Sequence, residues 1–518
     1  MHHDIILSTI NAKWIHPSLG LRLLKANLGP AEERCKIVEF ALRQPLEEKV
    51  NAIMAARPFI LGLSVAIWNH TASTELLEEL KKQWKNRAAF EAEISGNRDI
   101  KSMRPYIVLG GPEVSYLPPN AAIFRYADFI VRGEGEHAFR QICEQILSGC
   151  ESPYHNYPVH QVDIHTIKTA YHLYSTEDLC RKLIYVESSR GCPFNCGFCL
   201  SAIKTEVPGL EKAGSPNTQT HNQVRFFPVD QFLAEMGVLI SRGARTFKFL
   251  DRTFNLDIKR ALKILEFFLD KIDEQKNILP VPFVVHFEMI PSCFPRELRE
   301  CLYRFPPGTL RLEIGIQTLN AEVSAIVCRP CNPEKELAAL RFLREKTNAI
   351  IHADLIAGLP GEDLVSFGTG FDRLWNALSP RAGETEQGCT AGQELHAESG
   401  AAHPRSEIQL GILKLLPGAP IARLSENFGM RYNLSPPYEI METAALGAHD
   451  LDRIKNFARF WELIVNRGLV NNTALETPVF EKFMALSDSL FTHFGRNWGI
   501  AKNELCTELD KRHFTGKI

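Results

Sequence analysis

Three cysteines, Cys192, Cys196 and Cys199, lie close together in the run Glu187-Ser-Ser-Arg-Gly-Cys-Pro-Phe-Asn-Cys-Gly-Phe-Cys-Leu200, and they constrain the chain more than any other feature. A cubane iron–sulfur cluster is saturated by four thiolates, one on each iron. The spacing C-x3-C-x2-C supplies three, so one iron would keep an open site for another ligand. The surrounding chain must therefore form a scaffold that holds a cluster and leaves one side of it accessible.

A structural zinc site is the alternative interpretation of these cysteines. Zinc in such sites has four Cys or His ligands at short spacings. The closest candidate downstream, His221, lies in a polar stretch. Cys328 and Cys331 form a separate C-x-x-C pair without a second pair or a His cluster, so we expect incidental thiols there. The cluster interpretation accounts for the cysteine run without a fourth ligand.

Bulk properties indicate a cytoplasmic enzyme. The 518 residues suffice for about three domains. A formal net charge of −2 and a pI near 6.8 do not indicate nucleic acid as a partner. No apolar stretch approaches the length of a membrane span, and Met1–Leu7 lacks the cationic lead of a signal peptide. Thirteen cysteines with a metal-type cluster favour a reducing compartment over disulfides.

Residues 1–150 are predicted to form a separate α/β unit. Short runs rich in β-branched residues alternate there with amphipathic helical patterns. This alternation indicates a parallel, doubly wound sheet. The predicted strands are Asp4–Ile10, Lys36–Phe40, Phe59–Ala66, Tyr106–Gly110 and Asp128–Val131, and the predicted helices are Leu21–Leu28, Glu47–Ala56 and Thr71–Trp84.

The carboxyl ends of these strands are the expected ligand-binding edge of the sheet. The segments there are rich in Gly, Ser and Asn, which let the backbone approach a ligand closely. No G-x-G-x-x-G opens the first helix, which argues against a nicotinamide or flavin dinucleotide. A doubly wound domain that serves only as a scaffold stays open as an alternative. The candidate binding residues are Asn11, Ser18, Gly20, Ser64, Gly110, Gly111 and Glu113.

Residues 183–430 are predicted to form a partial (β/α)6 barrel, after a linker at residues 151–182. Parallel barrels place their chemistry at the carboxyl ends of the strands. In the linker, Ser175-Thr-Glu-Asp178 is typical of a helix N-terminus. The predicted strands are Leu183–Glu187, Thr246–Leu250, Val281–Phe287, Leu310–Ile316, Ile350–Ile356 and Ile408–Leu416, with helices at Val229–Ser241, Ile258–Ile272 and Pro333–Lys346.

Polar motifs follow the predicted barrel strands at that edge. The cysteine run follows the first strand and Asp251–Asn255 the second, while Glu313–Thr318 ends the fourth and Asp354–Glu362 the fifth. These motifs should therefore gather around the cysteine run. Two simpler interpretations stay open: Glu313 as a carboxylate paired within a barrel layer, and Gly358–Gly361 as only a tight turn.

Two segments look like insertions, and the end of the chain is helical in pattern. Lys85–Arg104 is charged and irregular, and residues 381–405 are polar and unpatterned, which favours disorder over a lid. Residues 431–518 are predicted to be a small helical domain, with Thr477 as the cap before Pro478. Its predicted helices are Ile440–Ala448, Leu451–Val465, Thr477–Phe494 and Lys502–Lys511, and its predicted aromatic core is Phe457, Phe460, Trp461, Phe480, Phe483 and Phe491.

The cysteine run resembles the signature of the radical S-adenosylmethionine (SAM) superfamily. Phe198 fills the aromatic position before the third cysteine, where the backbone meets adenine in that family. The resemblance implies that the three cysteines bind a [4Fe–4S] cluster whose open iron chelates SAM. It also implies that Glu313 and Gln317 bind the ribose or methionine end of SAM, and that Asp251 and Arg252 lie near the methionyl amine and carboxylate.

The order of domains resembles the cobalamin-binding class of radical SAM proteins, including a subset that ends in an uncharacterised helical domain. Gly110–Glu113 and Gly133–Glu136 lie where that class has its glycine turns. Many cobalamin domains carry D-x-H-x-x-G, whose His binds cobalt. The near match here, Asp163–Lys168, lacks the Gly and falls in the linker. We therefore predict base-off, His-off cobalamin, with its benzimidazole tail in the cleft lined by the candidate binding residues.

The resemblance implies an enzyme that cleaves SAM reductively to a 5′-deoxyadenosyl radical and methylates an unactivated carbon of an unknown substrate. A reductant such as flavodoxin or ferredoxin would supply the electron. Cyclisation or rearrangement with both cofactors but without methyl transfer is one alternative. A non-catalytic iron–sulfur electron carrier is another, although carriers seldom leave an iron open or need a barrel.

Overall fold

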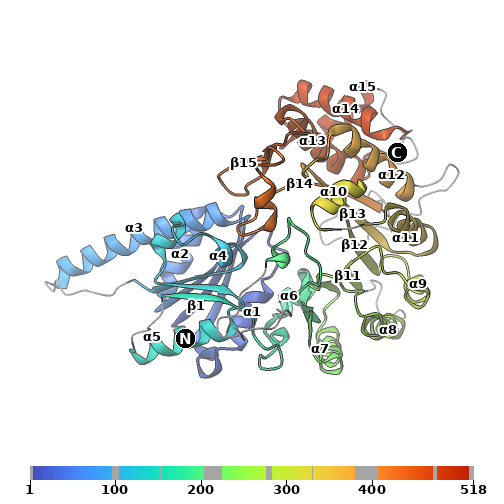
Figure 1. Ribbon diagram of the computed structural model, residues 1–518. Coiled ribbons are helices and arrows are strands. Elements are labelled where there is room, and N and C mark those ends of the chain that lie inside the picture. Colours follow the sequence, from blue (N-terminus) through green and yellow to red (C-terminus); the bar gives the residue numbers. More distant parts are fainter. Residues whose placement is uncertain are drawn as a thin grey trace, which may run out of the picture.

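The computed structural model describes residues 4–95, 104–150, 155–203, 224–275, 283–329, 331–379, 406–470, 475 and 477–512. Figure 1 shows two sheets side by side, the N-terminal one in blue and cyan and the second in green to yellow. The C-terminal helices, in red, pack at the top of the second sheet in this view (Figure 1). His221 and the predicted insertion at residues 381–405 lie outside the described residues.

The N-terminal sheet is parallel and doubly wound, as predicted. Its strand order is β2-β1-β3-β4-β5-β6. Alternate residues of the first strand pack on opposite faces: Ile6 and Ile10 meet α2 and α3, whereas Ile5 and Leu7 meet α1 and α5. The strands are β1 (Ile5–Asn11), β2 (Cys35–Ala41), β3 (Ile60–Ser64), β4 (Tyr106–Gly110), β5 (Phe129–Gly133) and β6 (Asn156–His160), and the helices are α1 (Leu19–Ala26), α2 (Leu46–Ala56), α3 (His70–Ser95), α4 (Pro112–Tyr116) and α5 (Glu136–Ser148).

Two predictions for this region are wrong. The start of the predicted linker contains the edge strand β6, which pairs with β5. The segment from Lys85 to Ser95, predicted to be irregular, continues α3, since it is rich in Ala and Glu, which favour helix. Later in the linker, the predicted helix start is confirmed: Ser175 and Asp178 form a reciprocal capping box at α6 (Thr176–Arg181).

The second sheet is the predicted open barrel of parallel strands. Its order is β14-β13-β12-β11-β10-β7. Buried and half-buried residues alternate along β12, so one set packs under the helices and the other faces the barrel interior. The strands are β7 (Ile184–Val186), β10 (Thr246–Phe249), β11 (Val284–Met289), β12 (Leu310–Gln317), β13 (Ile350–Ala357) and β14 (Ser406–Ile412), and the helices are α7 (Val229–Ser241), α8 (Ile258–Gln275), α9 (Arg296–Tyr303), α10 (Ala321–Ile326), α11 (Pro333–Lys346) and α12 (Leu364–Leu378).

The C-terminal part is helical, with two local corrections. Its helices are α13 (Ala448–Trp461), a π-helical turn (Glu462–Asn466), α14 (Val479–Phe494) and α15 (Lys502–Lys511). The predicted helix Ile440–Ala448 is wrong. Its first three residues form strand β16 (Ile440–Glu442), which pairs with β15 (Arg431–Tyr432). Thr477 does not cap α14. The carboxylate of Asp372, from α12, accepts hydrogen bonds from the amides of Val479 and Phe480 at 2.8 and 2.9 Å.

Aromatic side chains join these helices to the barrel in one continuous core. Phe371 of α12 lies 5.2 Å from the ring of Phe457 and 4.8 Å from that of Trp461. Of the six aromatics predicted for a separate bundle, five are buried, and Phe491 is 38% exposed. The helices therefore extend the barrel core and do not close a core of their own.

Polar contacts join the N-terminal sheet to the rest of the chain. Arg22 of α1 lies 2.8 Å from Asp178 of α6. The amide of Leu183, just before β7, donates to the carbonyl of Ile15 at 3.1 Å. In the described parts of the chain, no helix is both long and apolar enough to cross a membrane.

Candidate active site and cofactor cavity

The cysteine run forms a loop after β7 and the short strand β8 (Ser189–Arg190). Asp251, which is 2% exposed, fixes the start of this loop. Its carboxylate accepts hydrogen bonds from the Ser188 amide at 2.9 Å and from the hydroxyls of Ser188 and Ser189 at 2.7 and 2.6 Å. Because both of its oxygens accept hydrogen bonds from the start of the loop, Asp251 positions this segment.

The tip of the loop is held between two other segments. The Gly197 amide donates to the carbonyl of Val327, and the Ile421 amide donates to the carbonyl of Gly197, each at 2.8 Å. Cys196 is buried, whereas Cys192 and Cys199 are half-buried. Burial raises the pKa of the Cys196 thiol, and the Arg329 guanidinium opposes this increase.

This donor set fits a cubane cluster better than a single metal ion. Among the described residues, no three His, Cys, Asp or Glu side chains converge on one ion position. A cubane binds its thiolates on separate irons, so its ligands need not converge on one point. Three neighbouring thiols on one loop provide such ligands. The zinc interpretation gains no fourth ligand from the part of the chain that the structure describes.

Arg329 lies beside this loop and was not singled out from the sequence. Its Nη1 lies 3.5 Å from the Sγ of Cys196, and its Nη2 donates to the carbonyl oxygen of Gly315. Arg329 belongs to the C-x-x-C segment that we interpreted as incidental; Cys328 there is exposed. The feature of this segment that indicates a contact with the cysteine loop is Arg329, and not the cysteines on either side of it.

Glu313 lies in the barrel interior, where Lys248 and His286 contact its carboxylate. Its Oε2 lies 3.1 Å from Lys248 Nζ and 3.2 Å from His286 Nε2. The hydrogen bond with His286 and the charge of Lys248 lower the pKa of Glu313 to about 2. This geometry matches the simpler interpretation of Glu313 as a paired barrel-layer carboxylate.

Two other carboxylates face the same interior from neighbouring strands. The pKa of Glu288, on β11, is raised to about 7, because its burial outweighs the opposing charge of Arg252. Arg252 Nη1 lies 3.9 Å from Glu288 Oε1. Burial and the charge of Glu313 raise the pKa of Asp354, on β13, to about 7. Glu288 was not predicted, although the rule that barrel chemistry lies at strand ends would have identified it on the third strand.

Gln317 and Phe198 flank this region. Gln317 ends β12 with a φ of 69°, an uncommon conformation for a residue with a side chain. A Cβ on Gly315 would lie 2.4 Å from the side-chain nitrogen of Gln317, so the amide folds over the glycine. Phe198 is half-buried and packs against the barrel core.

A cavity of about 350 Å³ lies between the N-terminal sheet and the barrel. Four of the seven candidate binding residues line it, namely Gly20, Ser64, Gly110 and Gly111. Leu7 and Gly62 in the middle of the sheet line one end, and Glu187, Arg190 and Leu250 of the barrel domain line the other. The cavity therefore connects the interior of the sheet to the base of the cysteine loop.

The other three candidate residues do not line the cavity, and each has a structural contact. The Asn11 side-chain amide donates to Glu39 at 3.0 Å, and the Ser18 hydroxyl caps α1 by accepting from the Leu21 amide at 3.2 Å. Glu113 is 3% exposed. It accepts a hydrogen bond from the Tyr438 hydroxyl at 2.8 Å, and His70 Nδ1 lies 2.9 Å away. These three polar residues therefore cap a helix or hydrogen-bond neighbouring segments, and they do not line the cavity.

The cavity has the size and wall chemistry of a cofactor site. Ligand pockets are mostly apolar, with volumes of about 300–1,000 Å³. A Cβ on Gly110 would come no closer than 3.5 Å to another atom, the Val131 oxygen, so the missing side chain leaves free space. Gly111 has a φ of 101°, and a Cβ there would lie 2.6 Å from the Val65 oxygen. Among the described residues that line the cavity there is no histidine.

Two family models match separate parts of the chain. The model for the radical SAM superfamily matches residues 186–369, which include the cysteine loop and most of the barrel. The model for the B12-binding domain matches residues 6–143, which include most of the sheet that lines the cavity. The chain therefore contains a radical SAM domain and, before it, a B12-binding domain. Its cofactors are therefore a [4Fe–4S] cluster, SAM and cobalamin, and the cysteine loop and the cavity fit them.

A curated relative is similar to part of this chain. An uncharacterized methyltransferase, PH0819 of Pyrococcus horikoshii, is 28% identical over 180 residues. The match covers 31% of this chain and 36% of the relative, so it spans about a third of each protein.

Solved structures of two cobalamin-dependent enzymes share the fold. The radical SAM methyltransferase TsrM from Kitasatospora setae, solved with cobalamin and a [4Fe–4S] cluster, matches at 14% identity with a TM-score of 0.54, over 84% of this chain and 78% of that one. The cobalamin-dependent SAM radical enzyme OxsB matches at 14% identity with a TM-score of 0.61, over 98% of this chain and 75% of that one. The likeness to OxsB extends through the C-terminal helices.

Proposed function

We propose that this radical SAM protein is a cobalamin-dependent enzyme that methylates an unactivated carbon of its substrate. When bound, the cluster and SAM supply hydrogen abstraction from carbon, and cobalamin supplies a methyl group. The methyltransferase names of PH0819 and TsrM support methyl transfer over rearrangement. The observation that carries the proposal is that Glu187 and Arg190 line the cavity and also form the base of the cysteine loop.

At the cysteine loop, we propose that Cys192, Cys196 and Cys199 hold the cluster. Arg329 donates a hydrogen bond to Cys196, which favours the thiolate form that iron requires. The backbone contacts of Gly197 with Val327 and Ile421 fix the tip of the loop. A preorganised loop reduces the entropy lost on binding.

For the amino-acid end of SAM, we propose Glu288 together with Arg252. The two side chains lie close to each other at the ends of β11 and β10, so a carboxylate and a guanidinium are available for an ammonium and a carboxylate. Glu288 takes the role that the resemblance implied for Asp251. Phe198 and Gln317 remain the proposed contacts of the adenosine end, and Glu313 orders Lys248 and His286 between the strands.

In the cavity, we propose that Gly20, Ser64, Gly110 and Gly111 let the backbone approach cobalamin closely. The mostly apolar walls exclude water from the space next to the barrel. We also propose a cytoplasmic location, since thirteen cysteines and an oxygen-sensitive cluster suit a reducing compartment. A flavodoxin or ferredoxin is the proposed electron donor.

The test is product analysis with the reconstituted chain under reducing, anaerobic conditions. We expect 5′-deoxyadenosine to form from SAM, and we expect methyl-labelled SAM with added methylcobalamin to label a bound substrate. Deoxyadenosine without any methyl label would favour cyclisation or rearrangement. A protein that forms the cluster but never yields deoxyadenosine would be an electron carrier, and the proposed function would be wrong.

A further inference from the structure

Two arginines lie opposite each other at the base of the cysteine loop. Strand β8 pairs antiparallel with β9 (Arg225–Phe226), and the register sets Arg190 against Arg225. Like charges directly opposite each other in a strand pair are destabilising. This two-stranded element therefore needs carboxylates from elsewhere to neutralise it.

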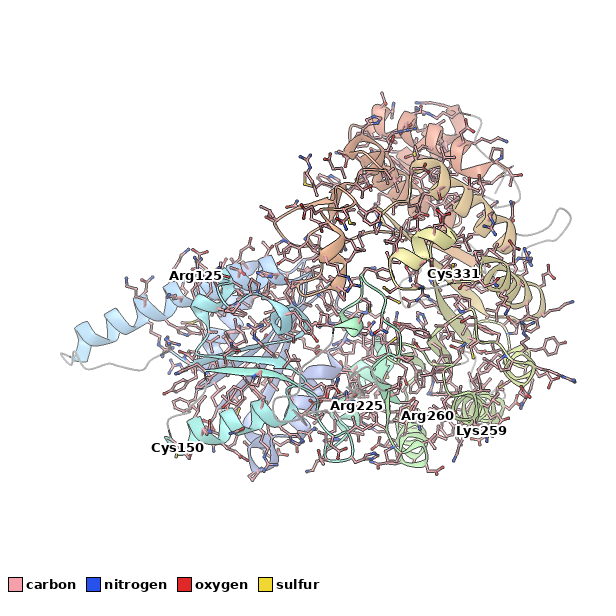
Figure 2. All side chains as sticks on the ribbon, in the orientation of Figure 1. Arg125, Cys150, Arg225, Lys259, Arg260 and Cys331 are labelled. Carbon is pink, nitrogen blue, oxygen red and sulfur yellow. The ribbon has the colours of Figure 1, made fainter. Side chains whose placement is uncertain are left out.

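Those carboxylates come from the B12-binding domain. The turn between β5 and α5 presents Glu134 and Glu136. Arg190 Nη2 lies 2.7 Å from Glu136 Oε1, and its Nη1 lies 3.6 Å from Glu134 Oε2. Arg225 donates to both oxygens of Glu134, with 3.0 Å between its Nη1 and Oε2. We call these contacts of Arg190 and Arg225 with Glu134 and Glu136 the interdomain joint; Figure 2 labels Arg225.

Arg190 is also fixed from the barrel side. Its Nε lies 3.1 Å from each carboxylate oxygen of Glu187, and its Nη2 lies 2.7 Å from Oε1. The side chain of Arg190 is only 11% exposed. A charge this buried is stable only while its partners keep their geometry, so a shift of either domain has a large free-energy cost.

The joint touches both cofactor sites. Glu134, Glu136, Glu187 and Arg190 all line the cavity. Only Gly191 separates Arg190 from Cys192, and its φ of 100° permits the sharp change of direction into the loop. A displacement of Cys192 would therefore move the cavity wall, and a displacement of the wall would move Cys192.

We propose that Arg190 is a positioning residue that couples occupation of the cobalamin cavity to the geometry of the cysteine loop. A loop held by its cluster keeps Arg190 against Glu136, which sets the cavity wall in the shape that receives cobalamin. Coupling between two binding sites is reciprocal, so cobalamin stabilises the cluster-holding loop by the same factor. The inference uses the two cofactor assignments and does not depend on which reaction the enzyme performs.

The test is a titration of the full chain with aquacobalamin, followed by absorbance, in cluster-loaded and cluster-free protein. We expect the loaded wild type to bind about tenfold more tightly than the cluster-free wild type, within the usual range of coupling between sites. In Arg190→Gln, the two affinities should agree within about twofold. Arg190→Lys should retain part of the difference, because a lysine keeps the charge but not the forked contacts.

Arg22→Gln is the matched control. Arg22 is also a buried interdomain arginine, with a side chain 5% exposed and contacts to Glu39 and Asp178 at 2.9 and 2.8 Å. It does not line the cavity or join the cysteine loop. Its substitution should lower stability but preserve the difference between loaded and cluster-free protein.

Glu136→Gln removes the same contact from the side of the B12-binding domain. This variant serves as the test if Arg190→Gln does not fold. It should also bring the two affinities together. Equal affinities in the wild type would overturn the proposal, and so would a full tenfold difference in folded Arg190→Gln or Glu136→Gln. Because no turnover is measured, neither outcome bears on the proposed methyl transfer.

Discussion

In the N-terminal sheet, the strand positions that line the cavity are apolar side chains and glycine, such as Leu7, Val108 and Gly110. The barrel strands instead turn charged residues such as Lys248 and Glu313 toward the interior. Both sheets are parallel and six-stranded. The same alternation of strand and helix thus produces two kinds of site.

The difference follows from the ligands that each site has to accept. A large cofactor is accommodated where side chains are left out, so its affinity depends on free volume. A small charged ligand is held by ordered charges, so its affinity depends on ionisation. Substitutions that fill space should therefore affect the first sheet, and substitutions that remove charge should affect the second.

The largest expected effect concerns the cysteine loop. Replacing Cys192, Cys196 or Cys199 by Ala should abolish the four-iron cluster, because each thiolate is the proposed ligand of a separate iron. Cobalamin binding should persist, weakened by the coupling through Arg190. Iron and sulfide analysis with electron paramagnetic resonance measures both cofactors. The controls Cys328→Ala and Cys331→Ala should keep the cluster, and full cluster content in Cys196→Ala would refute the ligand assignment.

Next in size is a pair of matched glycine substitutions, one in each sheet. A Cβ on Gly110 would lie 3.5 Å from the Val131 oxygen, and one on Gly411 of β14 would lie 3.5 Å from the Leu355 oxygen. Gly110→Val should weaken cobalamin binding at least about tenfold, or ~1.4 kcal/mol, because it fills the cavity. Gly411→Val should leave cobalamin affinity unchanged. Similar losses in both variants would mean that the effect is on folding and not on the cavity.

A smaller effect is expected from ionisation in the barrel. Burial raises the pKa of Glu288 to about 7, so its carboxyl is neutral below that pH and attracts an ammonium only above it. SAM affinity should therefore rise several-fold as the pH increases through this range, and Glu288→Gln should remove the dependence. Titrations with SAM on either side of neutrality measure this.

Glu362→Gln is the control for that pH dependence. Burial raises the pKa of Glu362 to about 7 as well, but its carboxylate accepts a hydrogen bond from Thr318 at 2.6 Å and is 2% exposed. This variant should keep the wild-type pH profile. A Glu288→Gln protein that also kept it would remove Glu288 from the SAM site.

Much of the fold could be predicted from the sequence, because apolar periodicity is a local property of each strand and helix. Tyr106–Gly110, Val229–Ser241 and Lys502–Lys511 have the predicted bounds. The edge strand β6 and the strand β16 could not be recognised, because β6 has a proline at its centre and β16 has only three residues. The cap of α14 is supplied by Asp372, which is distant in sequence.

The candidate sites could be located to strand ends but not to side-chain roles. Asp251 and Glu288 both follow barrel strands, and only the serine contacts of Asp251 reveal that it is occupied. Ser18 and Glu113 are polar residues at strand ends that cap and tie elements instead of lining the cavity. Arg190 lay within the cysteine run itself, but its partners Glu134 and Glu136 belong to another domain.

We propose that the N-terminal cavity takes up cobalamin without a histidine ligand to cobalt. His16 lies in the loop after β1, but its Nδ1 is 2.8 Å from the hydroxyl of Tyr185, and it does not line the cavity. The decisive measurement is the electron paramagnetic resonance spectrum of cob(II)alamin bound to the reconstituted chain. We predict a base-off spectrum without nitrogen superhyperfine splitting from a lower ligand. Clear nitrogen splitting, or failure to bind cobalamin at all, would contradict this account.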